Sequence, residues 1–433
     1  MKKHLSLLLF SLLVVFTETS LAKDAPAVLV GRAISDNATE SAAAIAELRA
    51  MGPAGLQNLI EANEAEINRH IADPTFSPTS EWRRITAALD AVSQQKDSYL
   101  SGLFWYTDLS EARKAASLEG KPILSLRLLG KLTDELSCAN SRFFRTVLYS
   151  NAAVSSSLRE GFVLHWETVR AVPLITIDFG DGRKLQRTIT GNSIHYVLDS
   201  DGKLLDALPG LYGPSAFMRG LNEAQSLFKQ ISGAREQRLA ILANYYRIRT
   251  NKLSVDWLND ATKVGLKQPV DMRLEHDANG DALIIMPLAM TKMMSEATML
   301  RAMTAPADSL GRITDEAAWK KIAALHLSEA KLDERSIGLI KRQTQRLADS
   351  SKSFDTLLRK LQESIALDTV RNEYRMHTRL YAWLTADRGR SDVKAFNEKV
   401  YSELFATPHS DPWLGLLQPD VYTGLENGGV INK

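Results

Sequence analysis

Residues 120–128 read GKPILSLRL, and residues 136–144 read LSCANSRFF. The first stretch is an apolar run of strand length that begins after a Gly-Lys-Pro turn. The second places Cys138 directly before residues 139–148, which have the pattern of a helix. A buried strand followed by a polar loop and a helix is typical of an α/β domain. Cys138 is the only cysteine among the 433 residues, so it cannot form a disulfide within the chain.

The segments around these two stretches alternate between helices and strands. Asp108 has the position of a helix cap, and its helix is predicted to end at Gly120. Ser150 or Asn151 caps another helix. The other predicted elements are strands at 162–166, 194–198 and 203–208, and a helix at 215–230. This alternation predicts an α/β sandwich.

A Gly-Asp-Gly turn at residues 180–182 separates two strand-like segments, 174–179 and 184–190. Such a turn between apolar segments is a strong hairpin signal. Two interpretations of this hairpin stay open. It is either an inserted recognition element or a plain extension of the sheet.

The segment before the α/β unit is predicted to be helical. Helices at 42–48 and 54–67 are separated by Met51-Gly52-Pro53. A third helix, capped by Thr79 or Ser80, is predicted to continue to Leu100.

The segment after the α/β unit is also mainly helical, with one hairpin predicted at Asn279-Gly280. Its predicted helices are 315–330, 334–348, 354–366, 369–384 and 392–405. The predicted organisation is therefore a leader at 1–22, a helical module at 23–102, an α/β domain at 103–232 and a helical domain at 233–433.

The first residues have the pattern of an export signal. Lys2 and Lys3 precede an apolar run at 5–16, and Ser20-Leu21-Ala22 offers small residues for cleavage. The run is short for a membrane span, so no stable span is expected after cleavage. The prediction is a periplasmic or secreted protein, with an uncleaved N-terminal anchor as the alternative.

The composition excludes several function classes. Without residues 1–22, which contain Lys2, Lys3 and Glu18, the 53 basic and 51 acidic residues become 51 and 50. This balance gives no reason to expect nucleic acid or an anionic membrane as partner. No phosphate-binding glycine loop or nucleotide fingerprint occurs, so no cofactor is predicted.

Residues 104–230 resemble the thioredoxin-like superfamily, in particular its periplasmic thiol–disulfide interchange branch. Three passages carry the resemblance: Ser110–Leu126 with its Glu-Gly-Lys-Pro step, Cys138–Leu164, and Gly191–Gly210. The resemblance implies a thioredoxin-like central domain flanked by helical N-terminal and C-terminal regions. It also places the first active-site cysteine on Cys138 and the second on Ser141, so that the motif reads Cys-Ala-Asn-Ser. The family's cis proline falls on Ser193.

The resemblance implies a chemistry for these residues. Cys138, at the start of a helix, would be the nucleophile, because the helix dipole favours a thiolate there. Ser141 would donate a hydrogen bond to the sulfur and Arg142 would add positive charge, while Asn192 and Ser193 would face the substrate. Without a second thiol, a protein client or a small thiol such as glutathione must resolve the mixed disulfide.

Two functional hypotheses therefore remain open. One is a monothiol thiol–disulfide exchanger or isomerase that acts through Cys138. The other is a non-catalytic binding or scaffold protein, in which the cysteine is a small buried side chain and the helical flanks recognise a partner. The sequence does not specify an oligomeric state.

Three other clusters of side chains have mainly structural interpretations. His165 and His195 lie on predicted strands that strand 123–128 should separate, so no metal site is predicted. Six methionines between 286 and 303 are interpreted as a core helix, with Cu(I) ligands as the alternative. The basic side chains of Lys341, Arg342 and Arg346 are predicted to form a solvated helix face.

Overall fold

The computed structural model describes residues 25–75, 77–188, 191–265, 316–344, 351–387, 392–405, 407 and 430. Four predictions fall outside these residues: the export signal 1–22, the hairpin at Asn279-Gly280, the methionine cluster 286–303, and Arg346.

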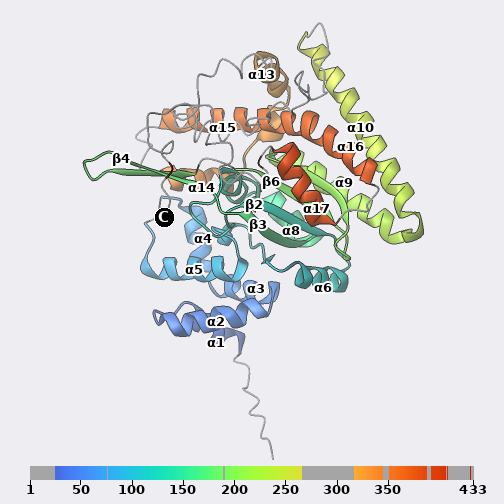
Figure 1. Ribbon diagram of the computed structural model, residues 1–433. Coiled ribbons are helices and arrows are strands. Elements are labelled where there is room, and N and C mark those ends of the chain that lie inside the picture. The colour runs from blue at the N-terminus through green and yellow to red at the C-terminus, as the bar shows by residue number, and fades with distance from the viewer. Residues whose placement is uncertain are drawn as a thin grey trace, which may run out of the picture.

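A five-stranded sheet forms the centre of the molecule, with the strand order β1-β3-β2-β6-β7 (Figure 1). Its strands are β1 (Trp105–Tyr106), β2 (Ile123–Leu129), β3 (Val163–Arg170), β6 (Ser193–Leu198) and β7 (Leu204–Pro209). β1, β3 and β2 are parallel, whereas β6 is antiparallel to β2 and β7 is antiparallel to β6. Every residue of β2, β6 and β7 is buried. The chain is therefore of mixed α/β class with a central mixed sheet and flanking helices.

Helices connect the parallel strands. The connections are α6 (Leu109–Glu119) between β1 and β2, and α7 (Ala139–Phe143), η2 (Phe144–Leu148) and α8 (Ala152–Gly161) between β2 and β3. Asp108 and Asn151 accept hydrogen bonds from the first backbone N–H groups of α6 and α8, which confirms both caps. Gly120 ends α6 with a φ of +64°, which glycine adopts without strain. The predicted helix 139–148 changes to π-helical geometry in η2.

The strand order separates the two histidines, as predicted. β2 lies between β3 and β6, with Ser125 paired to His165 and Leu126 paired to His195. Because successive strand residues point to opposite faces, the two imidazoles lie on different faces of the sheet. His165 contacts the Ser125 hydroxyl (2.9 Å), and His195 contacts the Tyr149 hydroxyl (2.7 Å).

Different helices cover the two faces. On one face the His195 ring contacts Phe144 of η2 and Phe217 of α9 (Pro214–Gly233). On the other face Tyr196 contacts the ring of Phe396 and donates a hydrogen bond to Asn397 Oδ1 (3.1 Å). The last two residues belong to α17 (Val393–Lys399), so a helix from near the end of the chain covers part of the sheet.

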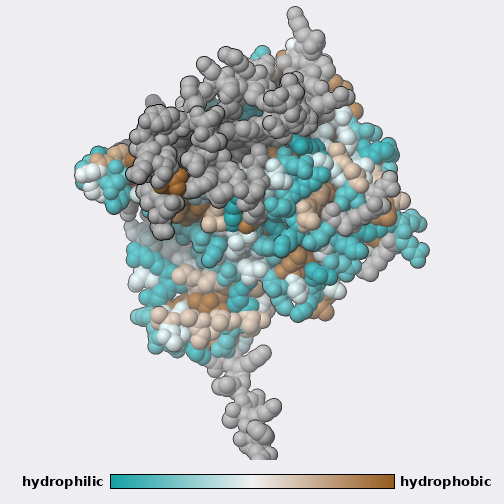
Figure 2. Space-filling view, in the orientation of Figure 1, coloured by the Kyte–Doolittle hydropathy of each residue, from teal (hydrophilic) through white to brown (hydrophobic). Residues whose placement is uncertain are grey.

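The predicted hairpin forms a separate two-stranded sheet of β4 (Leu174–Asp178) and β5 (Lys184–Thr188). It projects from the left side of the molecule in Figures 1 and 2, with both hydrophilic and hydrophobic side chains on its surface. Leu174 and Phe179 are each 53% exposed. The alternative of a plain extension of the central sheet is therefore wrong, because β4 and β5 pair only with each other in the described residues.

The N-terminal module consists of short helices. They are α1 (Pro26–Ala33), α2 (Ala38–Ala50), α3 (Pro53–Ala62), α4 (Glu64–Ala72), α5 (Ser80–Ser93) and the 3₁₀ turn η1 (Ser98–Leu100). Thr79 caps α5 through its hydroxyl, as predicted. The single helix predicted for 54–67 is interrupted at Asn63. The helix predicted to reach Leu100 ends at Ser93, because Gln94 and Asp97 adopt positive φ angles.

The C-terminal region packs long helices beside the sheet (Figure 1). They are α10 (Arg238–Lys263), α13 (Glu316–Leu325), η4 (Leu327–Ala330), α14 (Glu334–Thr344), α15 (Ser351–Arg371), η5 (Asn372–His377), α16 (Thr378–Asp387), α17, and η6 (Val400–Leu404), with η3 (Arg235–Gln237) preceding α10. The two helices predicted at 354–366 and 369–384 form one continuous run through the π-helical η5.

The described side chains form two hydrophobic cores. One lies within the N-terminal module and includes Leu339 of α14. The other contains the sheet together with buried residues of α10 and the helices that follow it. The C-terminal helices therefore share their core with the α/β unit, and the boundaries at 102 and 232 remain predictions.

Arg342 corrects the prediction of a solvated basic face on α14. Its guanidinium donates to the Tyr99 hydroxyl and to the His70 carbonyl, and also approaches the Pro74 carbonyl (3.4 Å). The helical pattern of residues 334–348 did not reveal this role, because the partners of Arg342 lie more than 240 positions earlier. Arg342 thus links the C-terminal helices to the N-terminal module.

Gly55 allows α2 and α3 to pack closely. A Cβ at this position would lie 1.9 Å from the Leu48 carbonyl oxygen, whereas a Cβ at Gly31 would meet no atom within 4 Å. We expect Gly55→Ala to destabilise the protein by about 1–3 kcal/mol through overpacking. Gly31→Ala, the control, should stabilise α1 by up to about 1 kcal/mol. Thermal unfolding checks both, and equal effects of the two variants would contradict this account of the α2–α3 contact.

Candidate functional site

Cys138 lies at the start of a helix, as predicted. It is the N-cap of α7, and its Sγ accepts a hydrogen bond from the backbone N–H of Ser141 (3.4 Å). The extended backbone at Cys138 (φ −60°, ψ 159°) is the usual conformation of a cap residue. The sulfur therefore occupies the position in which a helix start favours a thiolate.

The thiol is fully buried, with an exposed fraction of 0%. The core that contains the thiol also includes Tyr401, from near the end of the chain, and burial raises the pKa of this tyrosine. Tyr401 lies on η6 and is itself fully buried. A thiolate must be reached by its substrate before it can react, and this arrangement does not provide that access.

Cys138 belongs to the main hydrophobic core, but three of its neighbours in the sequence, Ser137, Asn140 and Ser141, are polar. We expected the Ser141 hydroxyl to donate to the sulfur, but the donor is the Ser141 backbone N–H. The hydroxyls of Ser137 and Ser141 and the Asn140 Oδ1 atom are buried and have no hydrogen-bond partner among the described residues. Buried polar atoms are normally satisfied by protein groups or by ordered water, so these three atoms are unusual in a packed core.

Arg142 connects the helix to the hairpin. Its Nη2 donates to the Thr188 hydroxyl (2.9 Å), and Thr188 in turn donates to the Ser137 carbonyl (3.4 Å). A role of Arg142 as a positive charge beside the sulfur stays a prediction. Thr188, at the end of β5, was not identified from the sequence, since its partner lies 46 positions earlier.

The structure brings the predicted substrate loop against the cysteine helix. Asn140 Nδ2 donates to Ser193 Oγ (2.7 Å), and both side chains are buried. Asn192 contacts two residues near the end of the chain: its carbonyl accepts from the Tyr401 hydroxyl (3.0 Å), and its amide donates to the Thr407 hydroxyl (3.1 Å). Neither contact was predictable from local sequence, because each spans more than 200 residues.

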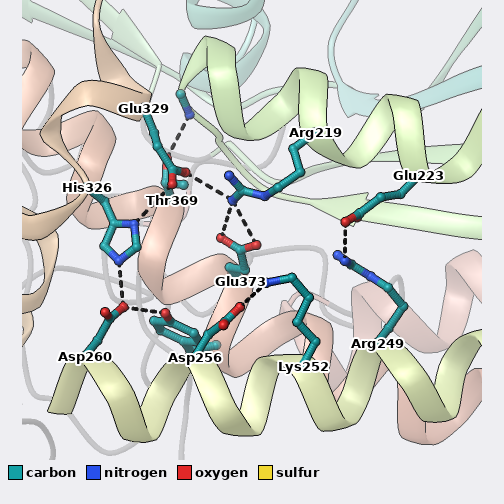
Figure 3. A network of polar contacts seen from close by, with 12 residues as sticks. Arg219, Glu223, Arg249, Lys252, Asp256, Asp260, His326, Glu329, Thr369 and Glu373 are labelled. Atoms are coloured by element: carbon teal, nitrogen blue, oxygen red, sulfur yellow. Dashed lines mark hydrogen bonds and ion pairs between the residues drawn. The ribbon is translucent and has the colours of Figure 1, made fainter. Parts of the chain in front are cut away.

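A second cluster of polar side chains lies between α9, α10 and the C-terminal helices (Figure 3). Arg219 donates to Glu329 (3.1 Å) and to both carboxylate oxygens of Glu373 (3.1 and 3.0 Å). His326 lies between two carboxylates, with Nδ1 3.2 Å from Glu329 and Nε2 2.7 Å from Asp260. An imidazole donates from both nitrogens only when it is protonated.

The charges in this cluster stabilise one another. Hydrogen bonding to Glu329 raises the pKa of His326, burial opposes the shift, and Asp260 raises it further, to about 9. Burial raises the pKa of Glu329, but hydrogen bonds from His326 and Arg219 outweigh burial and lower it to about 2. The Tyr374 hydroxyl also donates to Asp260 (2.5 Å).

The second cluster does not have the organisation of a catalytic site. Its Thr369 hydroxyl donates to the Ile365 carbonyl and accepts from the Gly213 N–H, so it is not activated as a nucleophile. Over the described ranges, no group of three or more His, Cys, Asp and Glu side chains has the geometry of a metal site. We interpret the cluster as an ionic contact that holds α10, η4 and η5 against α9.

Comparisons of the chain with protein-family models, with curated proteins and with solved structures found no match. Within the described residues, no helix combines the length and the apolar character needed to span a membrane. The candidate site is therefore interpreted from its own geometry.

His326 predicts a loss of stability at alkaline pH. Its pKa is raised from 6.5 to about 9, so its stabilising effect is complete below pH 6.5 and is lost as the pH rises through 9. Since the ring is part-exposed, solvent screening limits the effect to about 1 kcal/mol. Urea unfolding between neutral and alkaline pH should show this loss in the wild type and not in His326→Gln. Lys252→Gln, which breaks an exposed pair with Asp256, is the control and should keep the wild-type pH dependence.

Proposed function

We propose that residues 103–232 form a thioredoxin-like domain and that the protein binds partners without catalysing dithiol exchange. Three parallel strands in the order β1-β3-β2, followed by antiparallel β6 and β7, support the domain assignment. The position of Cys138 at the start of the first helix after β2 also supports it. Ser141 and Ser193 stand where the resemblance implies the second cysteine and the proline, so the groups needed for dithiol chemistry are missing.

The complete burial of Cys138 carries this proposal. In thiol–disulfide exchange the thiolate attacks one sulfur of a disulfide, so the substrate must reach the sulfur directly. The Asn192–Ser193 loop, which would face the substrate, already contacts Asn140, Tyr401 and Thr407. In this arrangement Cys138 acts as a small buried side chain that caps a helix.

The β4–β5 hairpin is the element that we assign to a protein partner. It is separate from the central sheet and exposes Leu174 and Phe179. A two-stranded hairpin has little stability of its own in water. The hydrogen bond from Arg142 to Thr188 fixes its base to the helix that follows Cys138, so a partner bound to the hairpin would also lie near the candidate site.

Monothiol exchange is the second candidate, because the Ser141 N–H donates to the sulfur. In that reaction the Cys138 thiolate attacks a client disulfide, the client S–S bond breaks, and a mixed disulfide forms. The released client thiolate takes up a proton. A second thiol of the client, or a small thiol, then attacks the mixed disulfide and restores Cys138. This route requires access to the sulfur.

The compartment is part of the proposal. The export-signal pattern at 1–22 supports a periplasmic or secreted protein, in which oxidising conditions make protein disulfides common. The nearly equal numbers of acidic and basic residues favour a protein partner over nucleic acid.

The reaction of Cys138 with an aromatic disulfide reagent tests the proposed function. In the folded protein we expect a rate at least about 100-fold lower than in concentrated urea, because the sulfur must first be uncovered. Cys138→Ser, which should give no signal, controls for nonspecific absorbance changes. A rate in native buffer equal to that of the unfolded chain would reject the binding role and favour exchange.

A further inference from the structure

The C-terminal strap, which we define as residues 392–405 and 407, lies over both the sheet and the candidate site. It consists of α17, η6, Phe405 and Thr407. Its first half contacts the sheet through Tyr196, whose hydroxyl donates to Asn397 (3.1 Å) and whose ring meets Phe396. Figure 1 shows α17, in red, across the front of the sheet.

The second half of the strap contacts the predicted substrate loop. The Tyr401 hydroxyl donates to the Asn192 carbonyl (3.0 Å), and Asn192 Nδ2 donates to the Thr407 hydroxyl (3.1 Å). Arg170, at the end of β3, donates to the Thr407 carbonyl (2.9 Å). The Thr407 N–H donates to the Tyr401 carbonyl (2.8 Å), so the two strap residues are held together.

The strap also contributes to the burial of the thiol. Tyr401 and Cys138 belong to the same buried hydrophobic core, and Tyr401 contacts the Asn192–Ser193 loop, whose Ser193 accepts a hydrogen bond from Asn140 of the cysteine helix. Tyr401 and Cys138 both have an exposed fraction of 0%. Displacement of η6 would therefore remove buried side chains from the core that contains Cys138.

Two of the contacts between the strap and the neighbouring α16 involve charged side chains. Lys399 lies over the ring of Trp383 at 4.6 Å, and Arg379 lies 3.9 Å from Glu403, whose side chain is 49% exposed. Such exposed charge contacts add little stability. The π-helical geometry of η6 is rare in proteins and is often found at functional sites.

We propose that the C-terminal strap is an intramolecular cover of the thiol site. In the closed state η6 and Thr407 contact Asn192 of the Asn192–Ser193 loop. Local release of η6 and Thr407 from this loop exposes Cys138 to a protein client. The inference rests on the thioredoxin-like domain proposed above. It adds to the proposed binding role a second state, in which the thiol is accessible. In this local opening only η6, Phe405 and Thr407 move away, while α17 stays on the sheet through the contacts of Phe396 and Asn397 with Tyr196.

Two tyrosine variants separate local release from global unfolding. Tyr401→Phe removes the hydroxyl that donates to the Asn192 carbonyl (3.0 Å). Tyr246→Phe is the control. It removes a buried hydroxyl of α10 that donates to the Leu205 carbonyl of β7 (2.8 Å), so the lost hydrogen bond does not involve the strap. Both lose one tyrosine–carbonyl hydrogen bond, so both should lower the urea midpoint to a similar extent.

The readout is the rate of Cys138 alkylation by N-ethylmaleimide in native buffer. We expect Tyr401→Phe to increase the rate about tenfold over the wild type, and Tyr246→Phe to leave it within about twofold. Thr407→Val, which removes the hydroxyl bonded to Asn192, is a second test that leaves the buried core intact and should also increase the rate.

Two results would overturn the proposal. If Tyr401→Phe and Tyr246→Phe increase the rate equally and in proportion to their loss of stability, only global unfolding exposes the sulfur. If neither Tyr401→Phe nor Thr407→Val changes the rate, the strap does not control access. In both cases the slow wild-type reaction would still support the binding role, whereas a fast wild-type reaction would reject that role itself.

Discussion

The sheet must be covered on both faces, and this requirement determines where the C-terminal region lies. Every residue of β2, β6 and β7 is buried, so neither face of these strands can meet water. η2 and α9 cover the face of His195. Between β3 and β6 the described chain forms a projecting hairpin and no helix, so α17 covers the face of Tyr196 instead. The same placement brings Tyr401 and Thr407 to the loop beside Cys138.

Charge pairing keeps the helices that precede the strap in place. Arg219 on α9 contacts Glu329 and Glu373, and His326 joins Glu329 to Asp260 on α10. Two cations are thus surrounded by three carboxylates, and each buried charge has a partner of opposite sign, which limits the desolvation penalty. Since η5 carries Glu373 and continues directly into α16, this ionic contact also holds the start of α16 in place.

Local signals in the sequence were sufficient to predict most helices and strands. They did not reveal contacts between residues that lie far apart in the chain. Asp108 and Asn151 act within their own helices, and their caps were predicted correctly because the donors lie two or three residues away. Ser193 was placed beside the cysteine helix only through the resemblance. Tyr401 and Arg342 were missed, because a tyrosine or an arginine in a helical pattern does not indicate a partner more than 200 positions earlier.

Cys138 belongs to the main hydrophobic core, which fits a small buried side chain. The polar residues next to it in the sequence are less easily explained. Here the Ser137 and Ser141 hydroxyls and Asn140 Oδ1 are buried beside it without hydrogen-bond partners in the described residues. Each such atom lowers stability, because it loses its bonds to water on folding. Exposure of these groups to water would remove the penalty, so their burial lowers the free energy needed for a local opening around α7.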